Sequence, residues 1–395
     1  MQSAGPAASQ AESSPVSWLG VMTGTSMDGI DVCLINCEND DPSRPRLLDF
    51  ASTPMPPALV KRLQALQTMG SFGEGPGAGQ AAHQDPRQDP LDAAAQAGLE
   101  LAQAIGQAVV QMQARHPGQR IAAVGVHGQT VRHRPERGYS LQLLHAPTVA
   151  EQTGLAVVYD FRNRDIAAGG QGAPLVPAFH AALLSGKKPA ALLNLGGLAN
   201  LSLVNPDEVL GFDTGPGNTL LDAWAHEQTG QALDLDGRLA ASGEVHPGLL
   251  KACLSDPYFA APAPKSTGRD AFHLGWLAAK AQAAGLSLAA LPPEDVQRTL
   301  VALTAQTIAQ QCPPGFQRLY VCGGGVHNPV LMTALSEALP AVSIEKTEAL
   351  GWPTQAIEAA AFAWLARACL RQEPGNRPSV TGARGPRILG SICPA

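Results

Sequence analysis

The sequence has no apolar run long enough to cross a membrane, and charged residues make up only 15% of its 395 residues. A membrane-spanning helix needs about 20 consecutive apolar residues, so we expect no transmembrane segment. The formal net charge of −6 is a mild acidic excess, which argues against a nucleic-acid-binding surface. Together these absences favour an enzyme in solution, with room for roughly two domains.

Cysteine is scattered rather than grouped. Of the seven cysteines, Cys33 and Cys37 are close in sequence, but no second ligand pair lies near them to complete a zinc site. We interpret the cysteines as small apolar packing residues, which fits a reducing compartment.

Two segments lack the features of a folded core. Residues 1–15 are rich in Ala, Ser, Gln and Pro and have neither the basic start nor the apolar centre of a signal peptide. We expect a disordered tail there. Residues 70–90 are rich in Gly, Gln and Pro and predict a flexible insert.

The remaining sequence alternates between apolar strand-like runs and helical patterns, and this order occurs twice. Such repetition predicts an α/β fold of two lobes, residues 16–186 and 187–395, with a cleft between them. The predicted strands are a hairpin at 16–36 and runs at 46–54, 121–126, 156–159, 190–195, 201–204 and 318–322. The predicted helices cover 91–114, 175–185, 217–229, 275–285, 293–311, 328–338 and 354–371. In the first of these helices, the apolar side is expected to hold Leu91, Leu99, Ile105 and Val109.

A turn rich in Gly, Thr and Ser separates the two apolar runs of the first hairpin. Asp28 and Gly29 form a strong hairpin signal within it. Glycines let a backbone approach a phosphate, hydroxyls donate hydrogen bonds, and a carboxylate can hold hydrated Mg²⁺. The alternative is an ordinary hairpin turn decorated with hydroxyls, and no simple Walker pattern is present.

Two further glycine turns follow predicted strands in the second half. Gly196 and Gly197 follow the strand at 190–195, and residues 323–325 are three glycines after the strand at 318–322. Glycines at such positions let a flat or charged ligand reach backbone amides near a helix N-terminus. Three turns of this kind, spread over both halves, predict a nucleotide bound between two lobes.

Polar residues cluster after two strands of the first half. His127, Gln129 and Thr130 follow the strand at 121–126 and could orient a sugar or a carboxylate, although a polar surface turn is the alternative. Residues 160–165 alternate carboxylates with arginines just before a glycine-rich turn. They are either a solvated ion-pair surface or a ligand-binding loop.

Two carboxylates are candidates for catalysis. Asp213 ends an apolar stretch and precedes a Gly-Pro-Gly turn, where it could act as a general base in phosphoryl transfer. It could instead cap the helix that starts near Gly217. Glu358 is the lone carboxylate of an apolar helix, so it is either exposed on one face or buried for a functional reason.

These motifs together resemble the anhydro-N-acetylmuramic acid kinase family, from about residue 18 to about residue 370. The resemblance rests on residues 24–31, 127–133, 160–162 together with 169–180, 194–200 and 212–218. It implies a two-domain ATPase fold like that of actin, hexokinase and Hsp70, with an interdomain cleft. It also implies that ATP and Mg²⁺ are used to convert 1,6-anhydro-N-acetylmuramic acid and water into N-acetylmuramic acid 6-phosphate. This reaction would serve peptidoglycan recycling in the cytoplasm, and a homodimer is expected, with neither a nucleic acid nor a membrane as partner.

The resemblance also implies roles for individual residues. Asp213 would be the general base, with Glu358 as its neighbour, and Asp28 would lie near Mg²⁺ through water, with no direct metal ligand predicted. Sugar binding is implied for His127, Gln129, Thr130 and Arg162, the last through the lactyl carboxylate. Nucleotide binding is implied for Gly24, Thr25, Ser26, Met27, Asp28, Gly29, Ile30, Asp31, Gly196, Gly197, Gly323, Gly324 and Gly325.

The chemistry of such a substrate determines what the base must do. The anhydro bridge joins C1 and O6 of one sugar, so O6 carries no proton, and a water must attack C1 while O6 takes the phosphoryl group. Two alternatives stay open. One is a different sugar or acyl kinase of the same fold, which would not need water. The other is a nucleotide-dependent chaperone module, which would turn over ATP without sugar and would need a separate peptide-binding domain.

Overall fold

A computed structural model describes most of the chain, namely residues 16–24, 27, 29–68, 89–187, 189–205, 208–268 and 271–395. The predicted tail at 1–15 and nearly all of the predicted insert at 70–90 lie outside the described residues. Within the part of the chain that is described, no helix combines the length and the apolar content needed to cross a bilayer.

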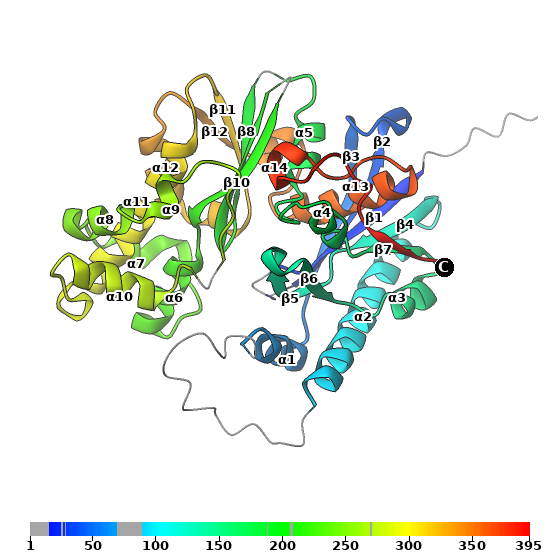
Figure 1. Cartoon of the computed structure of the whole chain (residues 1–395), viewed down its shortest axis with the longest axis horizontal. Helices are drawn as coiled ribbons and strands as arrows, with labels where there is room; N and C mark the ends of the chain where they lie inside the picture. Colours follow the sequence, from blue (N-terminus) through cyan, green and yellow to red (C-terminus); the bar gives the residue numbers. More distant parts are fainter. Residues whose placement is uncertain are drawn as a thin grey trace, which may run out of the picture.

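The first sheet contains six strands in the order β13-β7-β4-β1-β2-β3 (Figure 1). Strands β1, β2 and β3 form an antiparallel meander, β1 is parallel to β4 and β4 to β7, and β13 pairs antiparallel with β7. The bounds are β1 Ser17–Met22, β2 Gly29–Cys37, β3 Pro45–Pro54, β4 Ile121–Val126, β7 Ala156–Tyr159 and β13 Ser391–Cys393.

The second sheet repeats this plan with five strands in the order β10-β9-β8-β11-β12. Strands β8, β9 and β10 form the antiparallel meander, and β8, β11 and β12 run parallel. Strand for strand, β8 corresponds to β1 and β11 to β4, so the molecule contains two copies of one topology. The bounds are β8 Ala190–Leu195, β9 Leu198–Val204, β10 Val209–Pro216, β11 Arg318–Cys322 and β12 Ser343–Lys346.

Helices cover the outer faces of both sheets, and a small hairpin, β5 with β6, lies beside the first sheet (Figure 1). The hairpin strands are β5 Gln129–Arg134 and β6 Tyr139–Leu143. The helices up to the second sheet are α1 Pro57–Thr68, α2 Pro90–Arg115, α3 Ala146–Thr153, α4 Asn163–Ala167 and α5 Pro177–Leu183. The later helices are α6 Thr219–Thr229, α7 Arg238–Ala241, α8 Pro247–Leu254, α9 Pro257–Ala260, α10 Leu274–Ala283, α11 Pro293–Gln311, α12 Pro329–Ala338, α13 Ala356–Leu370 and α14 Pro378–Thr381.

Helix α13 lies against the first sheet although it follows the last strand of the second. A Cβ atom added to Gly20 of β1 would collide with the carbonyl oxygen of Ala359, and one added to Gly125 of β4 would lie 2.9 Å from the Cβ atom of Ala366. The helix backbone therefore touches the strand backbone at two glycines, which no other residue type would permit.

One hydrophobic core joins the two lobes. It contains Trp18 and Cys33 of the first sheet, Leu192 and Tyr320 of the second, and most of α13 between them. Helix α5 makes the reverse exchange, since it follows β7 of the first sheet but contacts β9 and β10 of the second. The division of the chain near residue 186 stays a prediction. Strand β13, near the C-terminus, pairs with β7 and so belongs to the first sheet.

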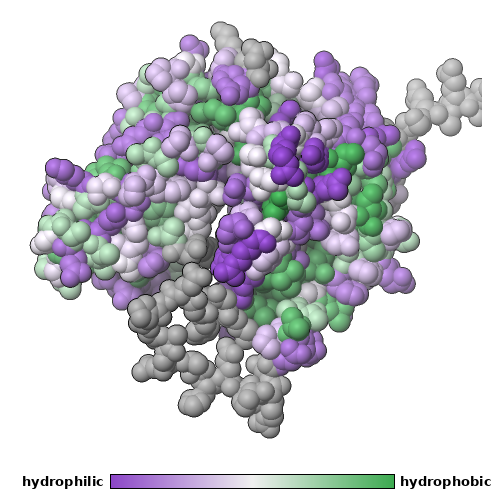
Figure 2. Space-filling view, viewed as in Figure 1, coloured by the Kyte–Doolittle hydropathy of each residue, from purple (hydrophilic) through white to green (hydrophobic). Residues whose placement is uncertain are grey.

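The structure confirms many of the predicted elements and corrects one helix face. Strands 121–126, 156–159, 190–195 and 318–322 and helix 293–311 have the predicted bounds. The hairpin of β5 and β6 and the strand β12 were not predicted. On α2, Ile105 and Val109 are buried as predicted, but Leu91 is 80% exposed and Leu99 is 39% exposed. The predicted face was wrong there because Leu99 lies six residues before Ile105, about 120° around a helix of 3.6 residues per turn, and because Leu91 lies in the exposed first turn of α2. Figure 2 shows hydrophobic side chains at the surface over α2.

The contact between α13 and β1 predicts a large cost for one added methyl group. Gly20→Ala should lower the free energy of unfolding by about 1–3 kcal/mol, because the new Cβ atom overlaps the backbone of α13. Urea denaturation followed by tryptophan fluorescence measures this change. Gly118→Ala is the matched control, since no atom lies within 4 Å of its added Cβ, and it should stay within about 0.5 kcal/mol of the parent. Equal midpoints for the two variants would contradict the close packing.

Candidate active site

The predicted phosphate turn lies beside the turn that follows β4. Because β1 and β4 are parallel neighbours, their carboxyl ends meet at one edge of the sheet. The Thr23 hydroxyl donates to the carbonyl of Gly128 (3.3 Å), and the His127 amide donates to the carbonyl of Val21 (3.1 Å). Of the eight predicted residues, the structure places Gly24, Met27, Gly29, Ile30 and Asp31 in or next to this turn. Thr25, Ser26 and Asp28 lie outside the described residues.

The two predicted glycine turns of the second lobe lie against each other. Gly323 has a φ of +84°, which favours glycine, and an added Cβ atom would lie 2.8 Å from the carbonyl carbon of Leu195. The amides of Asn218 and Thr219 donate to the carbonyls of Gly196 and Gly197, each at 2.9 Å. The carboxyl ends of β8 and β11 and the start of α6 therefore form one cluster of turns.

This cluster has features that fit a phosphorylated ligand. The Thr219 hydroxyl oxygen is buried at the N-terminus of α6 and has no hydrogen-bond partner among the described residues. Leaving a buried hydroxyl unpaired costs about 1–3 kcal/mol, and a helix N-terminus favours anions. An added Cβ atom on Gly324 would meet no atom within 4 Å, so open space adjoins the glycine backbone.

Asp213 lies on β10 directly opposite Asn200 of β9. The Asn200 side-chain amide donates to one carboxylate oxygen (2.9 Å), and the backbone amide of Thr267 donates to the other (2.9 Å). Burial raises the pKa of Asp213, while the hydrogen bonds from Asn200 and Thr267 and the charge of Arg162 oppose the rise. The carboxylate does not cap α6, whose N-cap residue is Asn218, so the capping alternative is wrong.

Helix α9 and the segment that follows it hold Asp213 in place. The Tyr258 hydroxyl donates to the Asp213 carbonyl (2.7 Å), and the Asp213 amide donates to the Lys265 carbonyl (3.1 Å). The Lys265 ammonium donates in turn to the carbonyls of Tyr258 and Phe259 (3.1 and 3.2 Å). Tyr258, Lys265 and Thr267 were not predicted as site residues, since nothing in a single sequence links residues about 50 positions apart.

Arg162 is held on two sides by the first lobe. Its Nε and Nη2 atoms donate to Nε2 of His127 (3.1 and 2.8 Å), and Nη1 donates to the carbonyl of Gly172 (2.7 Å). His127 must be neutral to accept, and burial lowers its pKa well below the usual value. His127 thus orients the arginine, and its predicted direct contact with a sugar stays a prediction.

The hydrogen-bond count of Arg162 leaves two N–H groups for a ligand. A guanidinium carries five N–H groups, and the three bonds above use one on each nitrogen. One N–H is left on each terminal nitrogen, which is the pair that binds a carboxylate in a fork. Burial lowers the pKa of Arg162 to about 10, while the charges of Glu358 and Asp213 oppose this change. Arg162, which follows a strand of the first sheet, is therefore close enough to interact electrostatically with Asp213 on the second.

Glu358 lies in the first turn of α13. Burial raises its pKa, the charge of Asp31 raises it further, and the charge of Arg162 lowers it. Glu358 is thus near both the phosphate turn and the arginine, and it is not a residue of the exposed helix face. The packing of α13 on Gly20 and Gly125 holds it there.

Gln129 and Thr130 begin strand β5 of the small hairpin. Gln129 is buried, and its side-chain carbonyl oxygen has no partner among the described residues. The Thr130 hydroxyl accepts from the Gln142 amide (3.1 Å). A buried acceptor without a partner fits a ligand donor, and the sugar contacts of both residues stay predictions.

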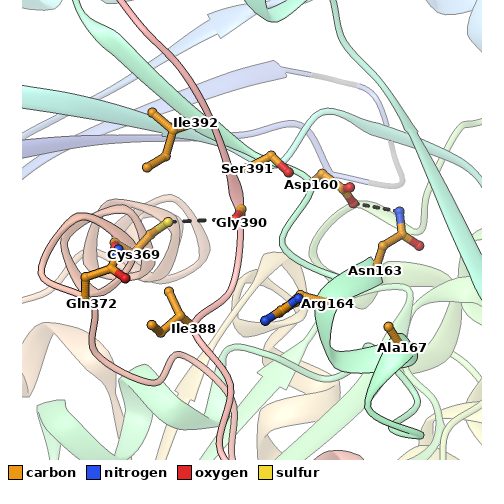
Figure 3. A pocket seen from close by; sticks show the side chains of 10 residues that line it. All are labelled: Asp160, Asn163, Arg164, Ala167, Cys369, Gln372, Ile388, Gly390, Ser391 and Ile392. Carbon is orange, nitrogen blue, oxygen red and sulfur yellow. Dashed lines mark hydrogen bonds between the residues drawn. The ribbon is translucent and has the colours of Figure 1, made fainter.

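The charged run at 160–165 is divided between two faces. The charge of Arg162 interacts with that of Asp213, whereas Asp160, Asn163 and Arg164 line a separate pocket of about 500 Å³ that Cys369 and β13 line on its other side (Figure 3). In this pocket the Asn163 amide donates to the Asp160 carboxylate (2.7 Å). The run is therefore neither wholly a solvated surface nor wholly a ligand loop.

The duplicated sheets, the exchanged helices and the glycine turns at the carboxyl ends of β1, β8 and β11 define a two-lobed ATPase fold, the class of actin, hexokinase and Hsp70. The predicted fold class is confirmed. Within this class, the chain belongs to the anhydro-N-acetylmuramic acid kinase family, whose family model matches residues 16–395.

Relatives in the family are similar over nearly the whole chain. A protein of Bordetella avium named anhydro-N-acetylmuramic acid kinase is 48% identical over 382 residues, which is 96% of each chain. A protein of the same name from Pseudomonas syringae pv. tomato is 46% identical over 96% of this chain and 99% of its own length. Among solved structures, the activator of 2-hydroxyisocaproyl-CoA dehydratase from Clostridium difficile with bound ADPNP has a TM-score of 0.42 at 10% identity, covering 90% of this chain and 96% of that chain.

The hydrogen bond between Asn200 and Asp213 predicts a change in acidity. Asn200→Ala removes a donor that stabilises the charged carboxylate, so the pKa of Asp213 should rise further above its ordinary value. Titration of carboxyl carbons by NMR, with the Asp213 signal assigned from Asp213→Asn, measures this pKa. Asn205→Ala, just past the end of β9, is the control and should leave the titration unchanged. A lower or unchanged pKa in Asn200→Ala would contradict the assigned bond.

Proposed function

We propose that this protein is an ATP-dependent kinase that opens 1,6-anhydro-N-acetylmuramic acid with water and phosphorylates O6. The products are N-acetylmuramic acid 6-phosphate and ADP, and the reaction serves the recycling of peptidoglycan. Family membership over residues 16–395 supports the substrate. The observation that supports the mechanism is that the charge of Arg162, which follows β7 of the first sheet, interacts with the charge of Asp213 on β10 of the second.

Arg162 binds the lactyl carboxylate that distinguishes this sugar. Its two free N–H groups present a planar fork, and the bonds to His127 and Gly172 hold the fork still before the sugar arrives. A fixed guanidinium loses little side-chain entropy on binding. Gln129 and Thr130 on β5 contact the rest of the sugar.

Asp213 activates the attacking water. The carboxylate accepts a proton from water, the water oxygen bonds to C1, the bond between C1 and O6 breaks, and O6 takes the phosphoryl group. Burial keeps the carboxylate basic, while the two donated hydrogen bonds fix its orientation. Glu358, whose charge interacts with Arg162 and Asp31, assists from α13.

ATP supplies the transferred phosphoryl group. The turn of residues 24–31 and the cluster of Gly196 and Gly197 would hold its phosphates, and residues 323–325 would hold its adenosine. Mg²⁺, which would neutralise charge on the phosphates, would be held near Asp28, a residue outside the described part of the chain. No group of three His, Cys, Asp or Glu residues in the described part of the chain is placed to bind a metal directly.

The enzyme works in the cytoplasm as a homodimer. All seven cysteines are free thiols, which fits a reducing compartment. The dimer is an expectation that sedimentation velocity tests, with a single species of the monomer mass as the contrary result.

Replacement of the base predicts a loss of turnover without a loss of structure. Asp213→Asn should keep the fold and the affinity for ATP but lower kcat by about 10²–10⁴-fold, the usual contribution of a general base. Steady-state kinetics, calorimetry with ATP and circular dichroism measure the three properties. Asp92→Asn on the exposed side of α2 is the control and should behave as the parent. A near-normal kcat for Asp213→Asn would remove Asp213 from the chemistry.

The proposed bond changes predict where solvent oxygen goes. In ¹⁸O-labelled water, the product should carry one label at C1 and none between C6 and phosphorus, because water attacks C1 and O6 keeps its oxygen. Mass spectrometry before exchange at the anomeric centre reads this pattern. An ordinary sugar kinase would leave every sugar oxygen unlabelled. Label in free phosphate with an unchanged sugar would show plain ATP hydrolysis and refute the proposal.

A further inference from the structure

A buried carboxylate behind the site has no role in the chemistry above. Asp165 on α4 is fully buried, and no Lys, Arg or His in the described residues forms an ion pair with it. Hydrogen bonds hold it, and its charge also interacts with that of Arg162. The side chains of Asn376 and Thr381 donate to one oxygen (2.7 and 2.8 Å), and the backbone amide of Gly172 donates to the other (2.8 Å).

Gly172 connects this carboxylate to the site. Its amide binds Asp165, and its carbonyl accepts from Nη1 of Arg162 (2.7 Å). Gly172 has a φ of +66°, a conformation that aims the amide and the carbonyl in these two directions at little cost for glycine. Whatever holds Asp165 therefore also holds one side of the guanidinium.

The groups that hold Asp165 come from the end of the chain. Asn376 precedes α14 and Thr381 ends it, and both are buried. The Thr381 carbonyl also accepts from the amide of Gln171 (2.8 Å), next to Gly172. The Asn376 side-chain carbonyl accepts from the amide of Arg387 (2.6 Å). The segment 376–387 is thus bound to the 165–172 loop at several points.

We propose that Asp165 is a positioning residue for Arg162. Asn376 and Thr381 hold Asp165, and through Asp165 and Gly172 they fix the orientation of the guanidinium group. The C-terminal segment then determines how strongly the enzyme selects a sugar that bears a carboxylate. This inference rests on the proposed contact between Arg162 and the lactyl carboxylate. If Asp165 only stabilised the fold, weakening its hydrogen bonds would change the KM for the anhydro sugar and the KM for ATP alike. If Asp165 positions Arg162, only the KM for the sugar that bears the carboxylate changes.

The test uses Thr381, because changing Asp165 itself would leave three buried donors unpaired and could prevent folding. Thr381→Val keeps the shape of the side chain and removes one donated bond. It should raise KM for the anhydro sugar about threefold to tenfold, the usual net effect of losing one intramolecular hydrogen bond. The KM for ATP and the kcat should stay within about twofold. Thr381→Ser, which keeps the hydroxyl, should restore the parent KM.

Two comparisons separate positioning from general damage. In an Arg162→Lys background, which lacks the fork, Thr381→Val should change KM by less than about twofold, since coupled residues are not additive. Ser379→Ala removes a different hydrogen bond of α14, the one to the Val209 carbonyl (2.6 Å), and should behave as the parent. An equal effect of Thr381→Val in both backgrounds, an equal rise in KM for ATP, or a parent-like KM in Thr381→Val overturns the proposal. So does a Ser379→Ala variant as impaired as Thr381→Val.

A neutral substrate separates this inference from the proposed function. The anhydro sugar with its lactyl carboxylate converted to an amide should be a poorer substrate for the parent enzyme, and Thr381→Val should affect it by less than about twofold. If the parent uses the acid and the amide equally well, the proposed carboxylate contact fails. In that case the positioning role is tested separately, by comparing the effect of Thr381→Val on KM in the parent with its effect in the Arg162→Lys background.

Discussion

The contact of α13 with the two glycines of the first sheet is the constraint on which the rest of the site depends. A helix normally packs on a sheet through side chains, but at Gly20 and Gly125 the backbones themselves touch. The alanines of α13 make this approach possible, since larger side chains would hold the helix away. Because α13 begins at the site, its close seating fixes Glu358 relative to Asp31 and Arg162. The same helix fills the core shared by both lobes.

The duplicated topology explains why residues far apart in sequence meet. In each sheet the first and fourth strands of the repeat run parallel, so their carboxyl ends share an edge. Ligands of α/β folds bind at such edges, where turns and helix starts expose amides and hydroxyls. Arg162 follows the fifth strand of one copy, and Asp213 lies on the third strand of the other. The exchange of α5 and α13 between the copies makes the two edges parts of one site.

The site concentrates buried charge and satisfies it with fixed hydrogen bonds. Asp213 is held by Asn200 and Thr267, Arg162 by His127 and Gly172, and Asp165 by groups that include Asn376. Burying these groups costs stability unless each finds partners, and the large apolar core offsets that cost. These charges are already oriented and need not reorganise during the reaction. Such preorganisation is the main way that enzymes stabilise developing charge.

The sequence by itself determined the family, the α/β class and most of the strands and helices. Local apolar patterns specify single elements such as the strand at 190–195 and the helix at 293–311. Glycine turns can be predicted too, because each one is formed by residues that are consecutive in the sequence. Asp213, Glu358 and Arg162 were also named from the sequence as candidate site residues, and their roles stay predictions. The tertiary structure alone decided that Tyr258, Lys265 and Thr267 hold Asp213, that His127 holds Arg162, and that β13 pairs with the first sheet. These contacts join residues tens to hundreds of positions apart, and such pairings arise from packing, which no local pattern records.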